Sequence, residues 1–163
     1  MFKIEVISDN YRSIVDNQIK ESWAGPYVAA RNVLHDTRTQ SGFVAVEDGK
    51  IIGYALYNIV NDECEITVLE SLHEQRGIGR ALINAVMETA KKSGCRRLWL
   101  ITTNDNTQAL RFYQKFGFSL RAVYINAMEE SRKLKPQIPL IGCDGIPIAH
   151  EFEFEIMLQK RIS

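Results

Sequence analysis

The sequence has few of the residues that would mark a disulfide-bonded, zinc-binding or membrane-spanning protein. Its three cysteines, Cys64, Cys95 and Cys143, are an odd number, lie far apart and occur in no Cys-x-x-Cys or His-x-x-x-His spacing. We therefore expect three reduced thiols and no bound metal. No apolar run approaches the ~18 residues of a membrane span, and residues 1–5 lack the apolar core of a signal peptide. These absences predict a cytoplasmic protein that does not act in a membrane.

An excess of either charge is also missing, because 20 basic residues balance 20 acidic ones. No large positive field would attract nucleic acid, so we expect no nucleic-acid partner. Proline is scarce, and three of the four prolines fall between 136 and 147. With 163 residues, 45% of them hydrophobic, the chain has the size of one compact domain, 1–163. Within it, 124–149 is predicted to be a helix followed by a Pro/Gly-rich loop.

Hydrophobic periodicity predicts an α/β fold in which helices pack on a mixed sheet. Helices are expected over 11–23, 107–116 and 124–134, and strands over 2–7, 43–46, 51–57, 63–69, 98–102, 118–123 and 152–158. The segment 27–40 fits either a helix or extended chain. In the last strand, Glu151, Glu153 and Glu155 alternate with apolar residues, which predicts one buried and one solvent-exposed face.

The most informative stretch is Gln75-Arg76-Gly77-Ile78-Gly79-Arg80, which runs directly into a helical pattern that ends at Ser93-Gly94. Glycines that open a helix leave backbone N–H groups free to bind a phosphate or pyrophosphate, although they also mark ordinary tight turns. The sequence lacks the Gly-Lys-Ser/Thr of a Walker loop, and Leu82 stands where a dinucleotide fingerprint needs a third small residue.

Two stretches resemble the GNAT superfamily of acyl-CoA-dependent N-acyltransferases, over roughly residues 1–124 plus the final strand. The first, 75–83, is similar to the family's pyrophosphate-binding segment, except that Glu74 stands where Gln or Arg is usual. The second, 106–118, is similar to the family's Asn-x-x-Ala-x-x-Phe-Tyr-x-x-x-Gly-Phe segment. The resemblance implies a mostly antiparallel central sheet of about seven strands, splayed in the middle, with helices on both faces. It also implies transfer of an acetyl group from acetyl-CoA directly to a small-molecule or peptide amine.

The resemblance also assigns residues to the cofactor. The pyrophosphate would be bound by the segment Glu74, Gln75, Arg76, Gly77, Ile78, Gly79 and Arg80. If the connection from the preceding strand to Gly77 is two residues short, backbone groups of Leu69 and Ser71 would bracket the acetyl carbonyl. Asn106 would contact the pantetheine arm or position its helix, and an N-cap role alone explains it equally well.

Acetyl transfer to an amine needs a group that removes the amine proton and one that protonates the departing thiolate. Tyr113 would donate the latter proton, as the resemblance implies, although periodicity alone explains it as a core residue. Glu63, Glu65 and Glu70 are candidates for the base: Glu65 if the connection to Gly77 is two residues short, Glu63 otherwise, and Glu70 where the family's strand bulges. A solvated acidic strand face is an equal alternative for each.

Two other features leave questions open. His35-Asp36 and His73 would suit a hydrolase, but no Gly-x-Ser-x-Gly elbow accompanies them, so surface positions are favoured over substrate-side ones. The sequence does not decide between a monomer and a homodimer. A non-catalytic acyl-CoA-binding domain is the alternative to an enzyme, since it would keep 75–80 without needing Tyr113.

Overall fold

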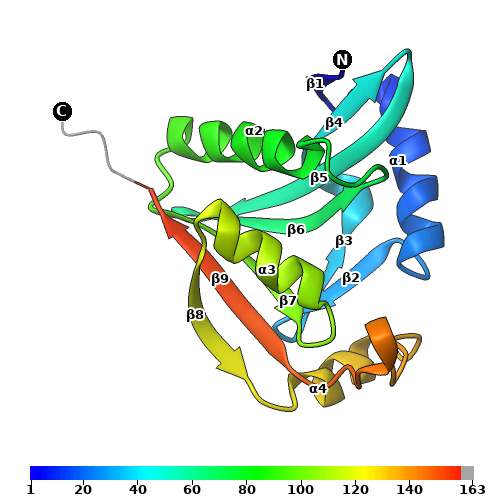
Figure 1. Cartoon of the computed structure of the whole chain (residues 1–163), viewed down its shortest axis with the longest axis vertical. Helices are drawn as coiled ribbons and strands as arrows, with labels where there is room; N and C mark the ends of the chain where they lie inside the picture. Colours follow the sequence, from blue (N-terminus) through cyan, green and yellow to red (C-terminus); the bar gives the residue numbers. More distant parts are fainter. Residues whose placement is uncertain (159–163) are drawn as a thin grey trace.

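The computed structural model describes residues 1–158, so 159–163 of the predicted domain lie outside the described part (Figure 1). The helices are α1 (Asp9–Ser22), α2 (Ile78–Lys92), α3 (Thr107–Phe116) and α4 (Ala127–Leu134), with short 3-10 turns η1 (Thr37–Thr39) and η2 (Cys143–Gly145). The strands are β1 (Lys3–Val6), β2 (Tyr27–Ala30), β3 (Val33–Asp36), β4 (Ser41–Glu47), β5 (Lys50–Val60), β6 (Glu63–Ser71), β7 (Arg97–Thr103), β8 (Ser119–Tyr124) and β9 (Glu151–Met157).

Seven of these strands form one sheet in the order β1-β4-β5-β6-β7-β9-β8. Every neighbouring pair is antiparallel except β6 and β7, which are joined through α2 and run parallel. A parallel pair needs such a crossover, whereas the Asp48-Gly49 turn suffices for β4 and β5, with positive φ at both residues. The predicted seven-stranded, mostly antiparallel sheet is confirmed.

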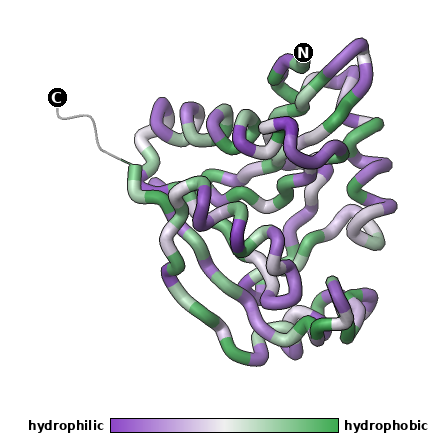
Figure 2. The backbone as a smooth tube through the Cα atoms, in the orientation of Figure 1, coloured by the Kyte–Doolittle hydropathy of each residue, from purple (hydrophilic) through white to green (hydrophobic). Residues whose placement is uncertain are grey.

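Helices cover both faces of the sheet, as expected. On one face α2 buries Leu82 and Val86 against the central strands, and α3 adds Tyr113 to the same core. On the other face α1 contributes Val15 and Ile19 to a second core. Figure 2 shows the alternating hydropathy along α2 that produces its buried stripe. No helix within residues 1–158 is long and apolar enough to cross a membrane.

The segment 27–40, for which the sequence allowed a helix or extended chain, is extended. The strands β2 and β3 form a two-stranded hairpin that is separate from the main sheet. Arg31 and Asn32 have positive φ at its turn, at 48° and 61°. The hairpin contacts α4, and Lys135 just beyond α4 donates its ammonium to the carbonyl oxygens of Trp23 and Tyr27, the latter at 2.6 Å.

The solvent-exposed glutamate face predicted for the last strand is wrong. Glu151 is 1% exposed and Glu153 is 7% exposed, while Glu155 is half-buried. The β2–β3 hairpin covers part of this face, since the Arg31 N–H donates to a Glu151 carboxylate oxygen at 3.0 Å. The alternation on β9 therefore separates an apolar buried face from a polar buried face.

Candidate active site

The turn between β6 and α2 leaves main-chain donors without partners. Gly77 is the N-cap of α2 and lies in the left-handed region with φ of 74°, and Gln75 has φ of 60°. No acceptor within residues 1–158 receives the amide N–H of Ile78, Gly79 or Arg80. A Cβ on Gly77 would meet nothing within 4 Å, so the space beside the turn is open. This arrangement of free N–H groups at the positive end of a helix favours an anion.

The charged side chains of this turn are directed elsewhere. Arg76 forms a bidentate ion pair with Glu47, the last residue of β4, with N···O distances of 2.7 and 2.8 Å. These hydrogen bonds lower the pKa of Glu47 to about 2. The Arg80 guanidinium lies 4.7 Å from the centroid of the Phe116 ring, and Glu74 is exposed. The free donors of this turn are therefore main-chain N–H groups, while its arginine side chains have partners within the protein.

The strands β6 and β7 diverge next to this turn. They pair only from Glu63 opposite Arg97 to Ile66 opposite Leu100. Beyond that point β6 continues to Ser71 and β7 to Thr103, but the two strands no longer pair with each other in the described part of the chain. The predicted splay is confirmed, and Leu69 and Ser71 lie on its β6 side.

A bulge accompanies the splay. In the pairing of β5 with β6, Leu56 faces Val68 while Tyr57 faces Ile66, so Thr67 is the extra residue. The bulge therefore lies three residues before Glu70, and not at Glu70 as the resemblance implied.

The helix α3 packs against the glycine turn through Phe112, the residue before Tyr113. The Asn106 side chain accepts the Ala109 N–H at 3.2 Å, so Asn106 is the N-cap of α3. A Cβ on Gly79 would lie 3.2 Å from the Phe112 ring, so α3 packs closely against the first turn of α2. Tyr113 is 9% exposed, stacks edge-on against Phe112 and Phe118, and has a pKa raised by burial. Its hydroxyl group is consequently neutral at physiological pH.

Two of the three candidate bases are engaged by strong partners. Glu63 forms ion pairs with Arg96 and Arg97, the latter at 3.1 Å. Glu70 accepts hydrogen bonds from the Tyr54 hydroxyl and, at 3.1 Å, from Ser22. Both carboxylates therefore already have hydrogen-bond or ion-pair partners within the protein.

Glu65 differs from both. It is 8% exposed and forms no hydrogen bond within the described residues. The basic side chain beside it is that of His35, whose Nε2 lies 3.6 Å from a Glu65 carboxylate oxygen. Burial, reinforced by the negative charge of Glu153, raises the pKa of Glu65 to about 7. A carboxyl group with this pKa is suited to exchange protons at physiological pH.

Comparison with known proteins agrees with this geometry. The family model for the acetyltransferase (GNAT) family matches residues 8–118. The chain belongs to the GNAT family. It is 45% identical over 133 residues to the YdhI protein of Bacillus subtilis (strain 168), covering 81% of this chain and 83% of that protein. It is 37% identical over 89 residues to the streptothricin acetyltransferase of Streptomyces lavendulae, covering 52% and 46% of the two chains.

The fold is similar to that of a GNAT family acetyltransferase from Elizabethkingia anophelis, which was crystallised with acetyl-CoA bound. The TM-score is 0.71 at 20% identity, over 96% of this chain and 98% of that one. In this GNAT chain no group of three or more His, Cys, Asp or Glu side chains among residues 1–158 is arranged to hold a metal ion.

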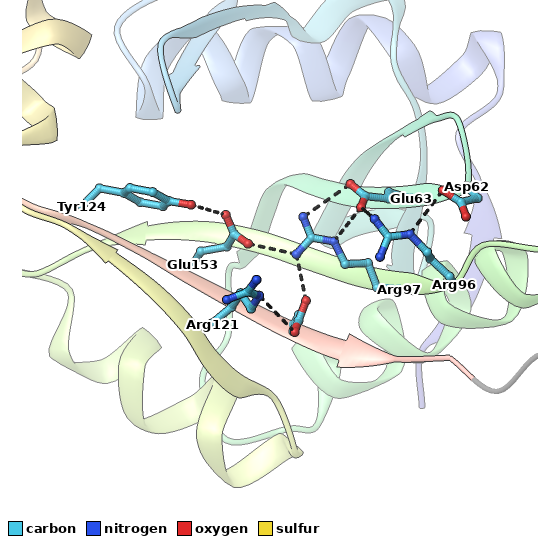
Figure 3. A network of polar contacts seen from close by, with 8 residues as sticks. Asp62, Glu63, Arg96, Arg97, Arg121, Tyr124 and Glu153 are labelled. Carbon is cyan, nitrogen blue, oxygen red and sulfur yellow. Dashed lines mark hydrogen bonds and ion pairs between the residues drawn. The ribbon is translucent and has the colours of Figure 1, made fainter.

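Sequence reasoning missed an ionic network on the face of the sheet opposite α2 and α3, drawn in Figure 3. Arg97 contacts Glu153 at 2.9 Å and Glu155 at 2.8 Å, and it also pairs with Glu63. The Tyr124 hydroxyl donates to Glu153 at 2.8 Å. The sequence signal for this network was Arg97 in the strand β7 together with the alternating glutamates of β9. Neighbouring strands bring residues of opposite charge together across a sheet.

On the same face of the sheet, the buried carboxylates Glu65 and Glu151 form no ion pair with a Lys or Arg side chain of the described residues. Glu151 has one oxygen with no hydrogen-bond partner, and burial raises its pKa. His35, for which a surface position was favoured, is instead buried at the side chain, whereas His73 is exposed as expected.

The 124–149 segment is fastened to the loop that follows β7. The Asn104 side-chain oxygen accepts the N–H groups of Ala149 and His150, each at 2.9 Å. Asp105 is buried and accepts the Thr103 hydroxyl at 2.5 Å and the Cys143 N–H at 3.1 Å. These contacts position the segment beside the divergent end of β7.

Proposed function

We propose that this protein transfers an acetyl group from acetyl-CoA to a primary amine by direct attack of the amine on the thioester. The observation that carries the proposal is the set of unpaired N–H groups of 78–80 located where β6 and β7 diverge. Backbone donors at a helix N-terminus suit a diphosphate, and the splay gives a thioester arm room to lie between the strands. Membership of the acetyltransferase (GNAT) family supports the same reaction.

The binding roles follow from this placement. The main chain of Gly77 to Arg80 holds the diphosphate, with Glu74, Gln75 and Arg76 shaping the turn. Leu69 and Ser71 direct main-chain groups toward the acetyl carbonyl. Asn106 fixes the start of α3, which keeps Phe112 against Gly79. The open space beside Gly77 is consistent with a bulky anionic group there.

Glu65 is the proposed base. A primary amine with a pKa of ~10.4 is protonated at neutral pH and cannot attack a thioester until it loses a proton. Glu65 has no competing cationic partner, whereas Glu63 and Glu70 are held by Arg96, Arg97 and Tyr54. Glu70 then positions Tyr54 and contributes to the shape of the site.

Tyr113 is the proposed acid. Its hydroxyl is protonated at physiological pH and so carries the proton that the departing thiolate needs, while burial makes it a weaker acid than an unperturbed tyrosine. The hydroxyl has no hydrogen-bond partner within residues 1–158, which leaves it available to a ligand.

The acceptor is a small-molecule or peptide amine that carries positive charge. Glu65 and Glu151 form no ion pair with a Lys or Arg side chain in the described residues. When they are ionised, they add negative potential to the face of the sheet that the β2–β3 hairpin covers. The names of two relatives represent the two acceptor classes. One is the streptothricin acetyltransferase, and the other is the ribosomal protein bS18-alanine N-acetyltransferase of Escherichia coli (strain K12), to which this chain is 28% identical over 79 residues.

Thiol release from acetyl-CoA over a panel of small and peptide amines tests the proposal. We expect amine-dependent release, reduced at least ~100-fold in Glu65→Gln and unchanged in Glu88→Gln, a matched substitution on the exposed side of α2. Tight acetyl-CoA binding with no amine-dependent release would support a non-catalytic acyl-CoA-binding domain. Full activity in Glu65→Gln would remove Glu65 from the reaction.

A further inference from the structure

An open pocket of about 540 Å³ lies at the edge of β5. It forms because β4 begins at Ser41 opposite Tyr57, so the last residues of β5 have β6 as their only strand partner in the described chain. Its lining includes His35, Gln40, Tyr57, Asn58, Thr89 and Ser93. We refer to it as the β5-edge pocket.

His35 lies between this pocket and Glu65. His35 is one of the residues that line the pocket, and its Nε2 is 3.6 Å from a Glu65 carboxylate oxygen. The two side chains are only 9% and 11% exposed. Asn58, the strand partner of Glu65, lines the same pocket. His35 is therefore the side chain that connects the buried carboxylate to the open space.

The Nε2 atom of His35 is available for proton transfer. It is buried and has no hydrogen-bond partner in the described residues. Burial lowers the pKa of His35, so its imidazole is neutral at physiological pH and can accept a proton. A shift of about 0.5 Å would bring Nε2 and the Glu65 oxygen into hydrogen-bond range.

The acetyl-transfer reaction releases a proton that must leave the site. An ammonium R–NH₃⁺ and a thioester give an amide, a thiol and H⁺. The C–N bond forms and the C–S bond breaks. Of the three nitrogen-bound protons, one stays on the amide and one replaces the proton that Tyr113 donates to the thiolate. The third is taken by Glu65, which is buried and must pass it on before the next turnover.

We propose that His35 relays this proton from Glu65 to solvent in the β5-edge pocket. Nε2 accepts the proton from the Glu65 carboxyl group, and the imidazolium releases one from Nδ1 to pocket water. Exchange of the ring protons with pocket water then restores the Nδ1–H tautomer before the next turnover. This inference rests on the proposed function, because it takes Glu65 as the base. His35 acts through Glu65 and does not itself contact the acceptor.

Several charged or titratable groups surround the pair. Glu65 on β6 faces His35 directly, and Asp36, next to His35 on β3, is held by Arg38. The remaining groups are Tyr57 on β5, which lines the pocket, and Glu153, Glu151 and Arg97, whose charges act on Glu65. The carboxylates favour transient protonation of His35, while burial favours its return to the neutral form.

The test compares His35→Ala with wild type in amine-dependent thiol release. We expect kcat to fall about 10- to 100-fold, with the KM for the amine nearly unchanged. Added imidazole should enter the vacated space through the β5-edge pocket and restore much of the rate. The pH dependence of the variant's kcat should follow the pKa of the added imidazole. His35→Gln, which keeps most of the volume, should lose a similar factor if folding affects His35→Ala.

The controls separate this inference from the proposed function. Ser93→Ala, on the lining of the same pocket, should keep wild-type kcat and show no response to imidazole. Glu65→Gln should be slow and should not respond to imidazole. A wild-type kcat in both His35 variants, or a loss that imidazole does not reverse, would overturn the relay while leaving the transferase intact. Full activity in Glu65→Gln would instead refute the base on which the relay depends.

Discussion

Replacing Glu65 by glutamine is expected to make stability less dependent on pH while it removes activity. Burial raises the pKa of Glu65 from 4.5 to about 7. Between these values the folded state keeps a proton that the unfolded state has lost. Stability therefore falls as pH rises through the window from about 4.5 to about 7. Below this window Glu65 is protonated in both states and the penalty is absent.

The magnitude follows from the width of this window. One pKa unit corresponds to about 1.4 kcal/mol, so the whole shift from 4.5 to about 7 costs wild type about 3.5 kcal/mol. About 2.5 kcal/mol of this loss falls between pH 5 and pH 8, because the window begins below pH 5. Glutamine does not ionise, so Glu65→Gln escapes this loss. Any change in packing is present at both pH values and cancels in the comparison.

Urea unfolding of wild type and variant at pH 5 and pH 8, at constant ionic strength, measures the effect. The difference in unfolding free energy, variant minus wild type, should be larger at pH 8 by about 2 to 3 kcal/mol. Glu74→Gln, an exposed position, should behave as wild type at both pH values. The same pH dependence in wild type and Glu65→Gln would refute the reasoning.

Three other substitutions have expected outcomes. Tyr113→Phe should change the free energy of unfolding by less than about 1 kcal/mol, because the hydroxyl has no protein partner, but it should lower kcat for thiol release at least ~10-fold. Gly142→Ala should lower Tm and destabilise by about 1 to 3 kcal/mol, because its Cβ would lie 2.1 Å from an Asp105 carboxylate oxygen. Arg76→Ala should leave Tm and acetyl-CoA affinity, measured by calorimetry, close to wild type. The proposed diphosphate donors are main-chain N–H groups, and the Arg76–Glu47 ion pair is partly exposed, with side chains 39% and 22% accessible.

The parts of the fold that the sequence predicted correctly are those specified by local chemistry. Glycine at 77 adopts the left-handed backbone that favours this residue, and Asn106 caps α3 as its position suggested. Apolar periodicity identified α2 because one face of this helix is buried in a core. Short apolar runs identified β4 and β5, which contribute residues to both cores.

The segment around 27–40 resisted prediction for a physical reason. Its two strands have only four residues each, and half of Val33 remains exposed. Contacts from distant residues, such as the Lys135 ammonium on the Tyr27 carbonyl oxygen, help to hold the hairpin in place. Such contacts leave no periodic signal in the local sequence.

The prediction that the glutamates of β9 face solvent was wrong for a related reason. Alternation reveals that a strand has two chemically different faces, but it does not reveal what covers each face. The compensating guanidinium of Arg97 lies more than fifty residues away from Glu153 in the sequence. The proximity of His35 to Glu65 was hidden in the same way, since it depends on the placement of the β2–β3 hairpin.

The most direct test of the account is an NMR titration of ¹⁵N-labelled protein with acetyl-CoA. If the main-chain N–H groups of 78–80 bind the diphosphate, the backbone amide signals of Ile78, Gly79 and Arg80 will move strongly as they acquire phosphate acceptors. The signal of Ile138, in the 124–149 segment, will not move. Saturation with acetyl-CoA that left the 78–80 amide signals in place would contradict the account.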